Sequence, residues 1–139
     1  MIAYFDTSAV VPLLIEEAGS TEASRLWQEA DRVASARIVY AEGHAALAQA
    51  ARGGRIPQDE LRTAVTSLVG LYEQLEVLEV SDALVRRAGA LAEQLALRGF
   101  DSVHLAAAEV VNEEDLVFVA GDAGLCEAAE RLGLRVARP

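Results

Sequence analysis

The sequence contains no lysine, and all 12 of its basic residues are arginines. A P-loop, a Schiff-base enzyme and a lysine general base each need a lysine, so these mechanisms are excluded. The single cysteine, Cys126, excludes an internal disulfide and a cysteine-rich zinc site. No apolar run approaches the roughly 20 residues that cross a bilayer, and no signal-peptide pattern is present. We therefore expect a cytoplasmic protein that does not enter a membrane.

Basic residues are also few beside the 22 acidic ones, which gives a formal net charge of −10. This charge argues against a protein that coats nucleic acid by bulk electrostatics. It leaves room for a local arginine patch, or for a metal ion that bridges carboxylates to phosphates. The 139 residues are 53% hydrophobic, so we expect one domain over residues 1–139 with a single substantial core.

Short apolar segments alternate with amphipathic ones along the chain. The apolar segments predict strands at 1–5, 33–36, 75–80 and 116–120, with a further strand within 134–139. The amphipathic segments predict helices at 7–20, 20–32, 38–54, 57–75, 82–99, 101–111 and 122–133. We expect Gly19 to end the first of these helices, Gly99 to end the fifth, and Asp101 to begin the sixth. The alternation predicts an α/β fold with a parallel sheet between layers of helices.

Four carboxylates lie where such a fold would place a site. Asp6 and Asp122 follow expected strands, Asp101 opens an alanine-rich helix, and Glu42 shares a helical face with small apolar residues. Each has a simpler interpretation, since the aspartates are suited to cap helices and Glu42 to lie in solvent at the margin of its stripe. Together they would converge beyond the carboxyl ends of one sheet, where their repulsion calls for a cation. Oxygen ligands of this kind suit Mg²⁺ or Mn²⁺.

Four stretches of the sequence carry a resemblance. They are FDTSAVVPLL at 5–14, YAEGHAAL at 40–47, RGFDSVHLAAA at 98–108 and VFVAGDAGLCEAAERLGLRV at 117–136. In this order and spacing they resemble the PIN-domain ribonucleases, most closely the VapC-like toxins of toxin–antitoxin pairs. The resemblance covers the chain from end to end. It implies a PIN-like three-layer α/β/α sandwich with a central parallel sheet of four to five strands.

The resemblance also implies an activity, which is hydrolysis of RNA phosphodiester bonds by one or two bound Mg²⁺ or Mn²⁺ ions. The metal ligands and catalytic residues implied are Asp6, Glu42, Asp101 and Asp122. In two-metal sites the ions lie about 3.5–4 Å apart, activate water and stabilise the leaving oxygen.

Three further positions bear on this implied site. Ser8 matches a small hydroxyl residue that lies beside the acidic cluster in the family, although it is equally suited to cap the first helix. His104 matches a position that is often histidine, which we interpret as rim or packing because the metal chemistry does not need it. Ala120 stands where the family often has Ser or Thr, and this leaves the coordination around Asp122 open.

The substrate and partners follow from the same resemblance. Arg37, Arg52, Arg55 and Arg98 are candidates for guiding the RNA backbone, with Arg98 also suited to stabilise a helix C-terminus. The RNA is expected to be single-stranded or looped. A small cognate antitoxin is the expected protein partner, and a homodimer the expected assembly.

Two other classes of function compete with this one. Phosphoryl transfer through an aspartyl intermediate also uses acids at strand tips, but receiver domains need a lysine, and the phosphatases need an aspartate where this chain has Ser8. A non-catalytic PIN-like module that binds a partner or RNA is the second, and the presence of all four acids argues against it.

Overall fold

The described residues, 1–111 and 113–139 of the computed structural model, form a sheet of five parallel strands in the order β3-β2-β1-β4-β5. Every neighbouring pair is parallel. The strands are β1 (Ile2–Phe5), β2 (Arg32–Ala36), β3 (Glu76–Leu78), β4 (Leu116–Val119) and β5 (Arg135–Ala137). The expected α/β fold with a parallel sheet is therefore confirmed.

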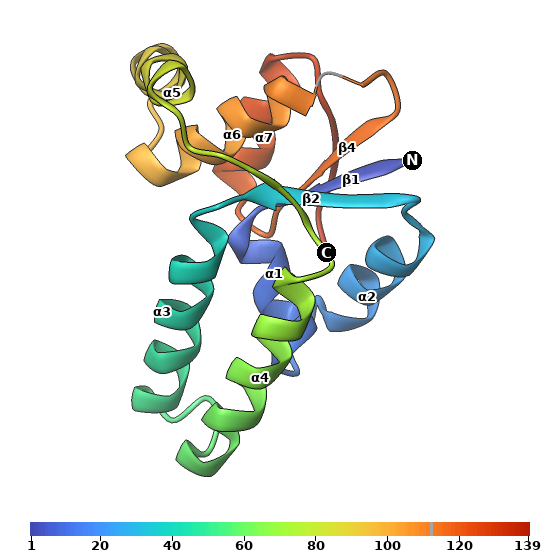
Figure 1. Ribbon diagram of the computed structural model, residues 1–139, viewed down its shortest axis with the longest axis vertical. Coiled ribbons are helices and arrows are strands. Elements are labelled where there is room, and N and C mark those ends of the chain that lie inside the picture. The colour runs from blue at the N-terminus through green and yellow to red at the C-terminus, as the bar shows by residue number, and fades with distance from the viewer. Residues whose placement is uncertain (112) are drawn as a thin grey trace.

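Helices cover both faces of the sheet. In Figure 1, α1 to α4 lie below the sheet and α5 to α7 lie above it. The helices are α1 (Thr7–Leu14), α2 (Ser20–Glu29), α3 (Val39–Arg52), the 3-10 helix η1 (Gln58–Glu60), α4 (Leu61–Tyr72), α5 (Asp82–Leu95), α6 (Gly99–Val111) and α7 (Ala123–Arg131). Within residues 1–111 and 113–139, none of these helices is both long enough and apolar enough to span a bilayer.

Strand β1 lies at the centre of the sheet and is buried on both faces. Ile2 and Tyr4 point into the core under α5, α6 and α7, whereas Ala3 and Phe5 point into the core over α1 to α4. A parallel strand covered by helices on both sides has no polar face, which explains why IAYF is apolar or aromatic throughout. The residue after this strand consequently emerges from the middle of the molecule.

Two expected helix ends are wrong. Helix α1 ends at Leu14, well before Gly19, and the next residue, Ile15, already has an extended backbone. Helix α5 ends at Leu95, and the left-handed residue after it is Ala96 (φ 54°). Gly99 instead begins α6, so Asp101 lies within the first turn of α6 and does not cap it.

The tips of β1 and β4 lie side by side at the carboxyl edge of the sheet. Phe5 pairs with Val119 in register, and the backbone N–H of Asp6 donates to the Val119 carbonyl at 2.9 Å. Beyond β4 the backbone of Gly121 approaches α1 so closely that an added Cβ would lie 3.1 Å from the Ser8 carbonyl oxygen. The chain segments that follow the two central strands are thereby joined at one place.

Candidate active site

Asp6 is a buried carboxylate with only 4% of its surface exposed. It is the N-cap of α1, where its Oδ2 accepts hydrogen bonds from the Ser8 backbone N–H (3.0 Å) and the Ser8 hydroxyl (2.5 Å). Its other oxygen, Oδ1, lies 3.6 Å from Nε2 of His104. Asp6 therefore caps the helix with one oxygen and presents the other to the neighbouring polar groups.

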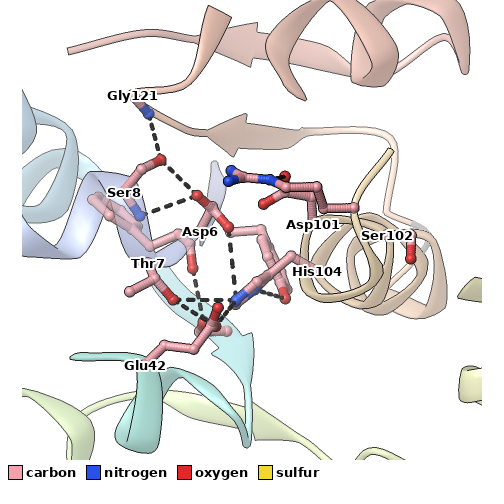
Figure 2. A network of polar contacts seen from close by, with 12 residues as sticks. Asp6, Thr7, Ser8, Glu42, Asp101, Ser102, His104 and Gly121 are labelled. Atoms are coloured by element: carbon pink, nitrogen blue, oxygen red, sulfur yellow. Dashed lines mark hydrogen bonds and ion pairs between the residues drawn. The ribbon is translucent and has the colours of Figure 1, made fainter. Parts of the chain in front are cut away.

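Ser8 connects the two central strands. Its hydroxyl donates to Asp6 and accepts a hydrogen bond from the Gly121 backbone N–H at 2.8 Å. Figure 2 shows the contacts running from Gly121 through Ser8 and Asp6 to His104 and Glu42. Ala120 is fully buried among apolar residues. The hydroxyl that lies beside the acidic residues is therefore that of Ser8, on α1.

Glu42 lies in the first turn of α3 and reaches the same cluster. Its Oε1 accepts from the Thr7 hydroxyl at 2.8 Å and lies 2.6 Å from His104 Nε2. Helix α3 packs tightly on α4 next to it, since a Cβ at Gly43 would lie 2.9 Å from a Leu68 methyl. Glu42 is 24% exposed and is held by these contacts, so it is not a solvated residue at the margin of its stripe.

His104 is fully buried between these carboxylates. Its Nδ1 lies 2.9 Å from the Tyr4 hydroxyl, and its Nε2 contacts Glu42, with Thr7 at 3.2 Å. Burial alone lowers the pKa of His104, but the hydrogen bond that it donates to Glu42 and the charge of Asp6 outweigh burial and raise it. The rim interpretation of His104 is therefore wrong, whereas the packing interpretation agrees with its full burial. Its one-turn spacing from Asp101 was the available signal, and the role of Thr7 was missed entirely.

Asp101 lies one turn before His104 on α6 and is half-buried. Its Oδ2 accepts from Nε of Arg98 at 3.1 Å. The pKa of Asp101 is raised, first by burial and then by the charges of Asp6 and Asp122, against the opposing effect of Arg98. A carboxyl whose pKa is raised by neighbouring carboxylates lies in a field of negative potential.

Asp122 is exposed and is the N-cap of α7, where its Oδ1 accepts from the Leu125 backbone N–H at 2.8 Å. The capping interpretation is thus correct in geometry, although the charge of Asp122 still reaches Asp101.

The four candidate arginines differ in position. Arg98 pairs with Asp101, whereas Arg37 pairs with Glu79 and the Tyr72 hydroxyl. Arg55 pairs with Glu17. Arg52 is the last residue of α3, about 15 Å along that helix from Glu42. The structure therefore brings Arg98 to the carboxylates and disperses the other three.

The carboxylates share one feature that bears on metal binding. Protein donors occupy one oxygen of each: Oδ2 of Asp6, Oε1 of Glu42, Oδ2 of Asp101 and Oδ1 of Asp122. Within residues 1–111 and 113–139 no three acidic, histidine or cysteine side chains are already grouped closely enough to hold an ion. The donor chemistry nevertheless fits a hard divalent cation, because each carboxylate keeps its second oxygen outside these hydrogen bonds.

A cavity of about 690 Å³ lies beside the cluster. Glu42, Arg98 and Asp101 line it together with apolar side chains of α5 and α6, among them Phe100, which is 66% exposed. The cavity thus joins a charged edge to an apolar wall.

Comparison with known proteins identifies the family. The PIN domain model matches residues 3–131. Ribonuclease VapC45 and Ribonuclease VapC49, from two strains of Mycobacterium tuberculosis, are each 40% identical over 136 residues, which cover 98% of this chain and 94% of theirs.

Solved structures share the fold at lower identity. PAE2754 from Pyrobaculum aerophilum has a TM-score of 0.72 at 21% identity, covering 98% of this chain and 92% of that one. Mycobacterium tuberculosis VapC20, described as a sarcin-ricin loop cleaving toxin, has a TM-score of 0.67 at 19% identity, covering 99% of both chains. The chain therefore belongs to the PIN-domain family, and within it to the VapC ribonucleases.

Proposed function

We propose that the protein is a metal-dependent endoribonuclease and the toxin of a VapBC-type toxin–antitoxin pair. The observation that supports this most directly is the set of four carboxylates at the carboxyl edge of the sheet, each held through one oxygen. The relatives named ribonucleases, at 40% identity, support the same reaction. The reaction is hydrolysis of an RNA phosphodiester bond.

In this proposal Asp6, Glu42, Asp101 and Asp122 hold Mg²⁺ or Mn²⁺, and the family resemblance carries that assignment. When bound, the metal activates water and stabilises the leaving oxygen. The protein's own contribution is to fix the carboxylates. The double hydrogen bond from Ser8 holds Asp6, and the contacts from Thr7 and His104 hold Glu42. The pKa of Asp101 is raised by burial and then by the charges of Asp6 and Asp122, so a cation there would stabilise its ionised form.

The substrate in this proposal is single-stranded or looped RNA. Arg98 is exposed beside Asp101 and is suited to contact a phosphate, while the exposed ring of Phe100 on the cavity wall is suited to contact a base. Arg37, Arg52 and Arg55 would contact the RNA farther from the carboxylates. A cellular RNA substrate would place the protein in the cytoplasm. The proposal treats residues 1–139 as one domain.

A small antitoxin is the proposed protein partner, and a homodimer the proposed assembly. Structures with this fold include a toxin–antitoxin complex from Klebsiella pneumoniae and FitAcB from Neisseria gonorrhoeae. At identities of 19% and 17%, these structures support only a shared fold. The proposal of an antitoxin partner is therefore based on the membership of the chain in the VapC family.

The test is a calorimetric titration with Mn²⁺, combined with incubation on total RNA, for wild type, Asp6→Asn and Asp101→Asn. Glu109→Gln is the matched control, because Glu109 lies on α6 but pairs with Arg87 on the surface. We expect both aspartate variants to lose metal binding and cleavage together, and the control to keep both. A wild-type protein that binds no Mn²⁺ and cuts no RNA would overturn the proposal.

A further inference from the structure

A buried line of polar contacts runs from the middle of the sheet to Glu42. The Tyr4 hydroxyl, on β1, lies 2.9 Å from His104 Nδ1, and His104 Nε2 lies 2.6 Å from Glu42 Oε1. Tyr4 and His104 are both fully buried, and Glu42 is at the edge of the site. Three elements far apart in the sequence, β1, α6 and α3, are connected by this line.

The directions of these hydrogen bonds follow from the chemistry. An ionised carboxylate only accepts, so Nε2 must carry the proton that it donates to Glu42. The Tyr4 hydroxyl belongs to a phenol, which is neutral at ordinary pH and can both donate and accept a hydrogen bond. The phenol lies against the other ring nitrogen and restricts rotation of the imidazole. Nε2–H is thereby aimed at Glu42.

An apolar side chain could fill the space that His104 occupies, so packing alone does not require a histidine there. A histidine buried at the site of an apolar side chain must satisfy two ring nitrogens, and an unsatisfied one is costly. Here both nitrogens are satisfied, and the donor at Nε2 lies within 3.6 Å of Asp6 Oδ1 as well as against Glu42. A hydrogen-bond donor is thus inserted between two carboxylates that would otherwise repel each other.

We propose that His104 is a positioning residue that acts through Glu42. Its Nε2–H and the Thr7 hydroxyl hold Oε1, so that Oε2 is the oxygen that Glu42 offers to an ion or to water. This inference rests on the proposed function insofar as Glu42 is a metal ligand. Groups that support a metal ligand in this way typically change metal affinity or activity about 10- to 100-fold when they are removed.

Two amides of equal polarity separate positioning from packing. The side-chain nitrogen of Gln reaches roughly the place of Nε2, whereas that of Asn reaches roughly the place of Nδ1. His104→Gln therefore keeps a donor toward Glu42, and His104→Asn keeps one only toward Tyr4. We expect calorimetry to show Mn²⁺ affinity within about threefold of wild type for His104→Gln, which restores one hydrogen bond. For His104→Asn we expect a loss of about 10- to 100-fold.

Leu91→Ala is the control for a purely structural effect. Leu91 lies on α5 and is fully buried in the same core, so its truncation lowers the melting temperature without touching the carboxylates. We expect this variant to bind Mn²⁺ as wild type does. Positioning is overturned if Mn²⁺ affinity falls in proportion to the loss of stability in Leu91→Ala and in both His104 variants alike.

Cleavage kinetics provide an independent check. If His104 acts through Glu42, its effect disappears once Glu42 is changed, so His104→Asn combined with Glu42→Gln has the kcat of Glu42→Gln alone. Additive losses in kcat would overturn the inference.

A crystal structure of His104→Asn without metal separates this inference from the proposed function. We expect the Glu42 carboxylate to leave Thr7 or to occupy several rotamers. An unmoved Glu42 overturns positioning even if the wild type is an active nuclease. A displaced Glu42 supports positioning even if the wild type binds no metal, and in that case the proposed function alone fails.

Discussion

The two halves of the acidic cluster are built differently. The inner half, Asp6 and Glu42, is held by side-chain hydroxyls and by the fully buried His104. The outer half consists of Asp101, which is about as exposed as Glu42, and of the exposed Asp122, and it is held by an exposed arginine and by a helix N-terminus. The inner carboxylates thus have their positions set by packing and hydrogen bonds from several elements.

This difference suggests that the two halves have different roles in the site. In the inner half the protein itself compensates the buried charge, and the geometry exists before any ligand arrives. In the outer half the pKa of Asp101 remains raised, so negative charge there is incompletely compensated. We infer that the inner half sets the geometry and that the outer half completes the site when a cation neutralises it.

The largest effect is expected from breaking the inner half at Glu42. Glu42→Gln keeps the size of the side chain but removes its charge, and we expect RNA cleavage to fall more than about 100-fold, beyond the range for groups that only support a ligand. Initial rates on a fixed RNA measure it. Glu109→Gln, the surface control, should cleave as wild type does. Glu42→Gln with near-normal cleavage would remove Glu42 from the proposed ligand set.

A smaller effect is expected at Thr7, the second donor to Glu42. Thr7→Val removes one hydrogen bond to a carboxylate, so we expect cleavage to fall about 2- to 10-fold. Thr7→Ser keeps the hydroxyl and should restore most of the rate. Equal rates for the valine and serine variants would show that the hydroxyl contributes nothing.

In the outer half, Arg98 tests contact with the substrate. Its side chain is 82% exposed, so we expect Arg98→Ala to raise KM for RNA about 2- to 5-fold with kcat almost unchanged. Arg86→Ala is the matched control, since Arg86 is 79% exposed and pairs with Asp82 on α5. An equal change in both variants would indicate only the loss of one positive charge.

The smallest effect concerns stability. In chelator, Asp101→Asn should raise the melting temperature by about 1–3 °C, because it removes a carboxylate that burial, Asp6 and Asp122 disfavour more than Arg98 favours it. Calorimetric scans measure it. Asp82→Asn, on an exposed surface pair, should show no increase.

The pH dependence of that difference has a definite sign. The folded protein binds a proton at Asp101 more tightly than the unfolded chain, whose carboxyl has a pKa near 3.8. The stabilisation from this proton is complete below that value and is lost as pH rises through the raised pKa. The advantage of Asp101→Asn should therefore vanish in acid and grow toward neutral pH. A constant difference would contradict the raised pKa.

Much of the fold could be predicted because buried parallel strands have a distinctive pattern. The apolar runs at 1–5 and 116–120 were located to within a residue at each end, as β1 and β4. Helix ends were harder, because a glycine is only one way to stop a helix. Ala96 ends α5 in a left-handed conformation, and α1 ends where Ile15 becomes extended. The strand order was beyond prediction, since the residues of one strand do not specify its neighbours.

The candidate site divides in the same way. Asp6 and Asp122 could be named because each follows a strand of an expected parallel sheet, and both also cap a helix, so the two interpretations were not exclusive. The polar contacts of His104 were missed because an alanine-rich helix does not reveal which of its faces meets a carboxylate. Its partners Tyr4 and Glu42 lie 100 and 62 residues away in the sequence.

The amino-acid sequence by itself determined the class of fold, the absence of lysine chemistry and the supply of carboxylates at strand tips, because these depend on local pattern and composition. The tertiary structure alone decided which donors reach each carboxylate. It placed His104 and Thr7 on Glu42, joined Ser8 to Gly121 and left Asp101 partly uncompensated. The physical reason is that hydrogen bonds and charge compensation depend on distances of about 3 Å, which arise only when the segments pack together.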